Sequence, residues 1–278
     1  MSRHPRFVAV LLAAALAIVA PRAYQTPKPY RILLTNDDGV RAPGIIALAE
    51  ALKTLGDVTI VAPLENQSGK GHSISITDPV YADTVVLPGG VNATALTATP
   101  ASCVKIGLAN IVKERPDLVV SGINRGYNLG YSAYISGTVG AAREAALQGI
   151  PAVAASLSIV GHPNYGPGAE MTRRIADSIK THGLPSGIFL NVNIPSGPIE
   201  AIKGLRLATQ SPTQGHERFE ERTTPSGRRY FWNVYEDPTT DREGTDVWTT
   251  TQGFVAVVPL RAGEFDAAAF QSLKGRFQ

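Results

Sequence analysis

Two adjacent carboxylates, Asp37 and Asp38, follow a short apolar run in the sequence ILLTNDDG at residues 32–39. Neighbouring side chains of a strand point to opposite faces, so both carboxylates reach one site only where the strand ends, and Gly39 permits that break. Two hard oxygen donors at the carboxyl end of a strand suit a divalent cation such as Mg²⁺, Mn²⁺ or Ca²⁺. A plain turn is the competing interpretation, because Asp and Gly are common turn residues.

Two glycine-rich segments add neutral oxygen donors to this pair of carboxylates. The sequence APLENQSGKGH contains Ser68 and His72, and the sequence SGINRGYNLG contains Asn124 and Asn128. Each follows a predicted strand, and the carboxyl ends of parallel strands share one edge of a sheet. We therefore expect Ser68 and Asn124 to join the two aspartates around a cation. Asn128 and His72 are candidates for contacting the substrate. The alternatives are that Asn128 is a turn residue and that His72 is an exposed loop histidine without a role in the site.

An anion site is expected at the start of an alanine-rich helix. Ser136, Gly137 and Thr138 precede this helix, and a helix N-terminus offers N–H groups and a positive dipole end to an anion. We expect these residues and Asn36 to hold a phosphate, while a simple N-cap is the alternative role for Ser136 or Thr138. A bound cation both activates water and neutralises a phosphoryl oxygen. The combination predicts hydrolysis of a phosphate ester.

The segments that carry these residues alternate between short apolar strands and helices. Such alternation indicates βαβ units and a mostly parallel sheet, so we predict an α/β fold: a three-layer, Rossmann-like, doubly wound sheet. The expected strands cover residues 31–36, 58–62, 118–121, 152–156, 187–193 and 254–259, and the expected helices cover residues 44–55, 102–114, 138–148 and 170–182.

The second half of the chain changes character. Strands are expected at residues 219–223 and 229–234, on either side of a Pro-Ser-Gly turn, and this pattern is typical of a β-hairpin. We place a C-terminal β-rich hairpin arm over residues 195–260. Three aromatic residues of the second strand favour packing in a core or between subunits over lining a base pocket: Tyr230, Phe231 and Trp232.

The N-terminal segment, residues 1–23, has the composition of a secretory signal peptide. Two arginines precede an apolar run of 14 residues, from Phe7 to Ala20, which is shorter than the roughly 20 residues of a membrane span. Cleavage after Ala23 leaves one domain over residues 24–278. We expect an exported, periplasmic protein without stable membrane association. An uncleaved anchor, or a cytoplasmic protein, is the alternative.

Charge and cysteine content exclude some classes of protein. The formal net charge is +3, and removing residues 1–23, which carry three arginines and no acid, brings it to 0. No nucleic-acid partner is therefore expected. The single cysteine, Cys103, excludes an intramolecular disulfide framework, and its apolar neighbours favour a packed core thiol over a nucleophile.

The chain resembles the SurE-type survival proteins, a family of metal-dependent 5'/3'-nucleotidases and acid phosphatases. The resemblance covers nearly all of residues 30–260 and is carried by the motifs ILLTNDDGVRAPGI, APLENQSGKGHSISIT, TPASCVKIGL, DLVVSGINRGYNLG, ISGTVGAAREAALQGIPAVAAS, NVNIP, RRYFW and TDVWTTTQGFVAVVPL. Departures are small and bear on substrate preference: Arg143-Glu144 stands where Met-Glu is common, and residues 131–135 lack acids often found there.

The resemblance implies a function and a set of site residues. It implies hydrolysis of nucleoside 5'- and 3'-monophosphates by a metal-activated water, with one divalent ion per subunit, Mg²⁺ or Mn²⁺. The metal ligands fall on Asp37, Asp38, Ser68 and Asn124, and either aspartate is a candidate general base. In that family such arms exchange between subunits, so the resemblance also implies a homodimer or homotetramer.

Two other functions compete with this one. A haloacid-dehalogenase-type phosphatase uses an aspartate nucleophile, but its DxD pattern differs from the adjacent aspartates of this chain. An exported protein that binds a nucleotide or a metal without turnover belongs to a different class. It has no need of a cation that activates water, and ligand binding without phosphate release would favour it.

Overall fold

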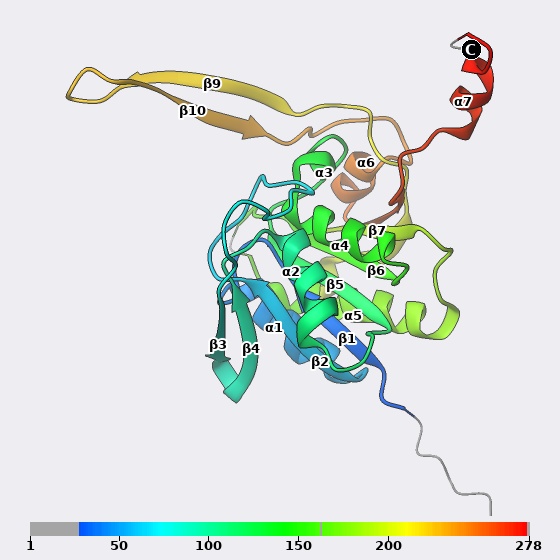
Figure 1. Ribbon diagram of the computed structural model, residues 1–278. Coiled ribbons are helices and arrows are strands. Elements are labelled where there is room, and N and C mark those ends of the chain that lie inside the picture. Colours follow the sequence, from blue (N-terminus) through cyan, green and yellow to red (C-terminus); the bar gives the residue numbers. More distant parts are fainter. Residues whose placement is uncertain (1–27, 162, 277–278) are drawn as a thin grey trace, which may run out of the picture.

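A computed structural model describes residues 28–161 and 163–276 of the chain. Its centre is a nine-stranded sheet in the order β3-β4-β2-β1-β5-β6-β7-β11-β8, and β9 and β10 form a separate two-stranded sheet (Figure 1). Within the large sheet, β3 pairs antiparallel with β4 and β11 with β7, and the other pairs are parallel. The strands are β1 (Arg31–Thr35), β2 (Asp57–Pro63), β3 (Ala82–Leu87), β4 (Val91–Leu96), β5 (Leu118–Arg125), β6 (Ala152–Leu157), β7 (Ile188–Ile194), β8 (Leu205–Leu207), β9 (His216–Thr223), β10 (Arg229–Glu236) and β11 (Val255–Arg261).

Helices cover both faces of the sheet, which explains why its central strands are apolar throughout. Ile32 and Leu34 of β1 pack in one core with α1 and α5, whereas Leu33 packs in a second core with α2 and α4. The predicted three-layer α/β fold is therefore confirmed. The helices are α1 (Pro43–Leu52), α2 (Pro100–Ile106), α3 (Ser132–Ile135), α4 (Gly137–Leu147), α5 (Tyr165–His182), α6 (Asp246–Thr251) and α7 (Ala267–Leu273), with a π-helical turn at Gly107–Ile111 and short 3-10 turns at Pro88–Gly90 and Ile199–Ala201.

Two parts of the sheet differ from the sequence-based expectation. The β3–β4 hairpin, closed through Gly89 and Gly90, was not predicted. The strand expected at residues 118–121 extends to Arg125, because the chain continues to pair with β6 after a register shift between Ser121 and Asn124. The SGIN motif therefore lies within β5 rather than after it.

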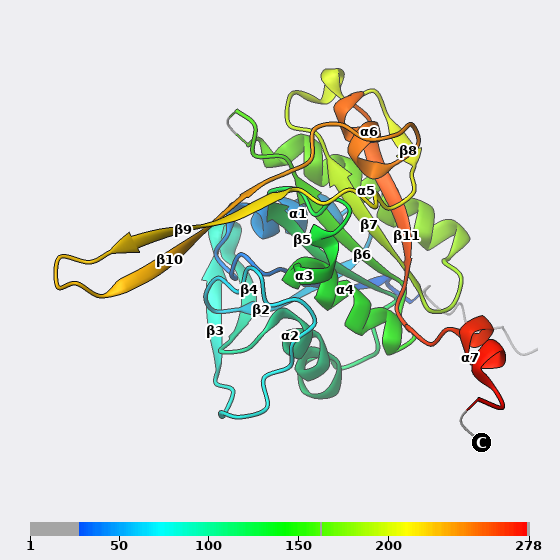
Figure 2. The same ribbon diagram turned by 90° about the horizontal axis from the view of Figure 1, so that it is seen from above.

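The arm is shorter than expected. Of residues 195–260, only β9 and β10 project from the body, as the view from above makes plain (Figure 2). The strands β8 and β11 belong to the main sheet, and α6 packs on β11 and β7. The arm carries exposed aromatic side chains, including Phe219, Phe231 and Trp232, at 57–63% exposure for the three.

Cys103 lies fully buried on α2 as a free thiol, as expected for a packed core residue, and burial raises its pKa. In the described part of the chain, no helix is long and apolar enough to cross a membrane. The predicted signal peptide, residues 1–23, lies outside the described residues.

Candidate active site

The residues expected to carry the chemistry meet at one edge of the sheet. Asp37 and Asp38 follow β1, the loop with Ser68 follows β2, and Asn124 lies near the end of β5. These three strands are adjacent, in the order β2-β1-β5, and parallel, so their carboxyl ends lie side by side. The N-terminus of α4 approaches the same point, as the contact described next demonstrates.

Asp37 is buried at 2% exposure and is held by the start of α4. The Thr138 backbone N–H donates to Asp37 Oδ2 at 3.1 Å, and the Thr138 hydroxyl donates to Asp37 Oδ1 at 2.5 Å. A side chain at Gly137 would place its Cβ 2.9 Å from the Asp37 Cβ, so the approach requires glycine. Burial raises the pKa of Asp37 to about 6, the neighbouring Asp38 adds to the rise, and the Thr138 hydrogen bonds oppose it.

Asp38 contacts the end of β5. The Arg125 backbone N–H donates to Asp38 Oδ2 at 2.9 Å. Burial raises the pKa of Asp38, while the hydrogen bond and the charge of Arg125 lower it. None of the ion pairs among the described residues involves Asp37 or Asp38. Two neighbouring carboxylates therefore share a partly desolvated position without a cationic side chain paired to either.

The loop after β2 is fixed against Asp37 through its backbone. The Gln67 N–H donates to the Asp37 carbonyl oxygen at 2.7 Å, which places Ser68 one residue from this contact. Ser68 is exposed, and its backbone N–H donates to Asn66 Oδ1 at 3.0 Å. Further along, a Cβ at Gly140 of α4 would lie 2.2 Å from the Gly71 carbonyl oxygen, so loop and helix are in close contact only because Gly140 lacks a side chain.

Asn124 directly precedes Arg125, whose N–H contacts Asp38. Its Nδ2 donates to the Gly126 carbonyl oxygen at 2.9 Å, and within the described residues no donor pairs with its Oδ1. The register shift in β5 turns this side chain, and Gly122 permits it, because a Cβ there would lie 2.4 Å from the Ala155 carbonyl oxygen. An orientation with the nitrogen satisfied leaves the oxygen as a free acceptor.

This donor set fits a hard divalent cation. Two carboxylates, one hydroxyl and one amide oxygen are the ligand types that Mg²⁺, Mn²⁺ and Ca²⁺ prefer. A cation would also supply the positive charge that the paired carboxylates lack. Over the ranges that the structure describes, no group of three or more His, Cys, Asp and Glu side chains is placed to hold a metal.

The residues predicted to bind phosphate differ in their hydrogen-bond partners. Ser136 caps α4 by accepting from the Val139 N–H at 3.2 Å, which is the simpler of its two expected roles. Asn36 is fully buried, and its Nδ2 donates to the Gly39 carbonyl oxygen at 2.8 Å. Its Oδ1 is buried without a partner among the described residues. Phosphate contact by these residues stays a prediction.

Asn128 joins a buried amide network beside the site. Its Nδ2 donates to Ser156 Oγ at 2.7 Å, its N–H donates to Asn193 Oδ1 at 2.8 Å, and its carbonyl oxygen accepts from Asn191 and Asn193. These bonds fix the loop that follows β5 on β6 and β7. A direct substrate contact by the Asn128 side chain stays a prediction.

His72 is tied to a buried carboxylate of α4. Its Nε2 lies 2.8 Å from Glu144 Oε2, and Lys105 Nζ lies 3.2 Å from Glu144 Oε1. Burial by itself raises the pKa of Glu144, but hydrogen bonds from Gln148, His72 and Lys105 hold that pKa below its ordinary value. The His72 side chain thus links the loop that carries Ser68 to the helix that holds Asp37.

Sequence reasoning missed several residues that position the site. Asp246, fully buried, accepts from the backbone N–H groups of Gly130 and Ser211 and so holds the far end of the loop that follows β5. Asn191 and Asn193 of β7 hold the same loop by donating to the Asn128 carbonyl oxygen. Their alternation in the NVNI sequence was a signal, because polar residues at period two in an apolar strand require buried partners.

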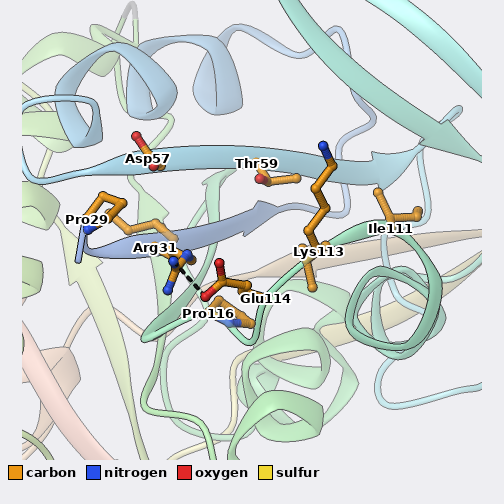
Figure 3. A pocket seen from close by; sticks show the side chains of 10 residues that line it. Pro29, Arg31, Asp57, Thr59, Ile111, Lys113, Glu114 and Pro116 are labelled. Carbon is orange, nitrogen blue, oxygen red and sulfur yellow. Dashed lines mark ion pairs between the residues drawn. The ribbon is translucent and has the colours of Figure 1, made fainter.

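The opposite edge of the sheet carries a cavity of about 390 Å³ with a different character (Figure 3). It lies at the amino ends of β1 and β2, where Arg31 pairs with Glu114 at 2.8 Å. Asp57 and Lys113 also line it. Asp37 and Asp38 lie beyond the other end of β1, so this cavity has no part in the site.

The chain is similar to proteins of one family, in sequence and in structure. Residues 32–217 match the family described as "Survival protein SurE". A "5'-nucleotidase SurE" of Geotalea daltonii is 42% identical over 232 residues, which cover 83% of this chain and 92% of that protein. One of Christiangramia forsetii is 40% identical over 247 residues, covering 87% and 94%. The crystal structure of the SurE protein of Aquifex aeolicus superposes with a TM-score of 0.78 at 37% identity, covering 89% of this chain and all of that one.

Proposed function

The chain belongs to the SurE survival protein family, and we propose that it is a metal-dependent phosphomonoesterase that hydrolyses nucleoside 5'- and 3'-monophosphates. One observation carries the proposal: among the described residues, Asp37 and Asp38 have no ion-pair partner, and they lie beside Asn124, whose amide oxygen accepts no hydrogen bond there, at the carboxyl edge of the sheet. The match to the family model covers residues 32–217, which include these side chains, and the relatives named 5'-nucleotidase match 83% and 87% of the chain.

The chain's own residues have distinct tasks in this reaction. Asp37, Asp38, Ser68 and Asn124 hold one divalent cation, Mg²⁺ or Mn²⁺. When bound, such a cation neutralises phosphoryl charge and makes a water more acidic. Thr138 fixes the orientation of Asp37 through both carboxylate oxygens. Asp37 or Asp38 accepts the proton of the attacking water.

The N-terminus of α4 and its surroundings receive the phosphate. Helix α4 has 11 residues, and the positive end of its dipole favours an anion at this position. Its Thr138 and Val139 N–H groups already donate to Asp37 and to Ser136. Asn36, Ser136 and Gly137 complete this proposed phosphate cradle. His72, oriented by Glu144, is placed in the loop next to Ser68 and is the candidate to contact the phosphate or the leaving oxygen.

Assembly and location are further parts of the proposal. The projecting β9–β10 arm, with its exposed aromatic side chains, supports a homodimer or homotetramer in which arms pack on a second copy. The sequence of residues 1–23 supports export to a periplasm. Fractionation of cells that produce the full chain tests the location, and a protein of full length in the cytosol would contradict export.

The deciding experiment measures phosphate release from a panel of 5'- and 3'-nucleoside monophosphates. The protein without residues 1–23 is treated with EDTA and then supplied with Mg²⁺ or Mn²⁺. We expect release to stop with EDTA and to return with metal. A folded protein that binds nucleotide but releases no phosphate with either metal would instead support the binding protein without turnover.

A further inference from the structure

A second cavity, of about 310 Å³, opens on the same edge of the sheet as the carboxylates. Its walls come from the loop that follows β5, from the segments that follow β6 and β7, from the segment after β10 and from α6. Tyr127 and Leu129 lie in the loop after β5, and Ile159 and Val160 lie after β6. The mechanism derived above uses none of these residues.

The register of the sheet fixes where this cavity lies relative to the metal ligands. Asn124 pairs with Ser156 across β5 and β6, and Ser156 pairs with Asn193 across β6 and β7. Neighbouring strands lie about 4.8 Å apart, so this row spans about 10 Å along the edge. The cavity begins just beyond the row, at Ser158 and Pro195. Asn124 and the cavity therefore lie on one edge of the sheet, about two strand spacings apart.

The chemistry of the walls excludes a phosphate from this cavity. Its lining contains one carboxylate, that of Asp237, and no Lys or Arg among the described residues. The apolar Leu129, Ile159 and Val160 suit the faces of a heterocyclic base. Tyr127, which is partly buried, adds an aromatic ring of the kind that stacks on a flat group. An uncharged, flat and partly polar group fits these walls.

We propose that this cavity is the nucleoside subsite of the enzyme. The base packs against Tyr127 and the apolar wall, and Asp237, exposed at the rim directly after β10, accepts hydrogen bonds from the ribose hydroxyls. A carboxylate is the group that binds ribose hydroxyls in other nucleotide sites of open α/β sheets. This inference rests on the proposed function for the placement of the phosphate, but nucleoside binding at the cavity does not depend on turnover.

The test fills the mouth of the cavity and compares substrates with and without a nucleoside. Thr239 is exposed and lines the cavity, whereas the adjacent Thr240 is exposed and does not line it. We expect Thr239→Trp to raise KM for AMP about tenfold or more, because a lost pocket contact is worth about that factor. Hydrolysis of p-nitrophenyl phosphate, which has no nucleoside, changes less than twofold. Thr240→Trp is the matched control, and we expect it to hydrolyse both substrates as the wild type does.

A second variant tests the contact with ribose. We expect the wild type to favour AMP over dAMP, and Asp237→Ala to reduce that preference, with partial rescue by Asp237→Asn. Binding of adenosine, measured by calorimetry, reads the subsite without any reaction and weakens in Thr239→Trp. Equal effects of Thr239→Trp on AMP and p-nitrophenyl phosphate, or unchanged adenosine binding, would overturn the subsite. If neither ester is hydrolysed but Thr239→Trp still weakens adenosine binding, the proposed function fails and the subsite stands.

Discussion

Thr138 contacts both oxygens of the Asp37 carboxylate across 101 residues of sequence, with its backbone N–H at 3.1 Å and its hydroxyl at 2.5 Å. One residue at the start of α4 thereby fixes the position and the rotation of the most buried carboxylate of the site. Hydrogen bonds to an ionised group contribute about 1.5–3 kcal/mol each. The same contact opposes the rise in pKa that burial imposes on Asp37.

Removing the Thr138 hydroxyl is expected to weaken metal binding without unfolding the protein. Thr138→Val keeps the shape of the side chain and the backbone contact but loses the donor to Asp37 Oδ1. Residues that orient a metal ligand typically change affinity about 10–100-fold. We expect Mn²⁺ affinity, measured by titration calorimetry, to fall by that factor. Thr138→Ser retains the hydroxyl and serves as the control; equal affinities of the two variants would contradict this role.

Asp37→Asn is expected to abolish phosphate release while the fold survives. The amide has the same shape but loses the negative charge needed for a divalent ion. Asp57→Asn, an exposed aspartate at the opposite end of β2, is the matched control and keeps wild-type turnover. Release of phosphate is measured with Mg²⁺ and Mn²⁺, and folding by circular dichroism. Substantial activity in the folded Asp37→Asn protein would remove Asp37 from the site.

The stability of the metal-free protein is expected to fall as the pH rises from about 4 to about 6. The folded state keeps a proton on Asp37 up to a pKa of about 6, whereas the unfolded chain loses it near 3.8, so the folded state binds more protons in this window. This difference corresponds to about 3 kcal/mol. Urea denaturation in EDTA measures it, and Asp37→Asn should remove most of the dependence. An equal dependence in both proteins would assign it to other groups.

Glu144→Gln is expected to lower the free energy of unfolding by about 1–3 kcal/mol at pH 7. The variant keeps the size of the side chain but loses the charge that pairs with His72 and Lys105. Because the folded pKa of Glu144 lies below its ordinary value of 4.5, its contribution is present above that pH and is lost as the pH falls through the folded pKa. The difference between variant and wild type should therefore shrink on acidification; a constant difference would point to packing instead.

Charges on the arm are expected to disrupt assembly. Phe231 and Trp232 are 57% and 58% exposed on β10, which is costly unless a partner covers them. The double variant Phe231→Asp/Trp232→Asp should shift sedimentation toward a smaller species. Val86→Asp, at a 63% exposed position of β3, controls for a charge added elsewhere. Unchanged sedimentation of the double variant would separate the arm from assembly.

Local patterns predicted most of the sheet correctly. Apolar runs bounded by Pro or Gly located β1, β2, β6, β7 and β11 to within a few residues, because buried parallel strands are apolar on both faces. The helix expected at residues 102–114 instead divides into α2 and a π-helical turn. The β3–β4 hairpin was missed even though Gly89-Gly90 between β-branched residues is a hairpin signal.

Sequence by itself determined the fold class and the donor types of the site. The NDDG, SG and SGIN motifs each follow or end a strand, and parallel strands bring such ends together whatever their separation along the chain. Only the tertiary structure decided which of these side chains have partners. The contact of Thr138 with Asp37, that of Glu144 with His72, and the cavity beyond Ser158 all join distant segments. They depend on helix placement and strand register, and local residue patterns do not encode either one.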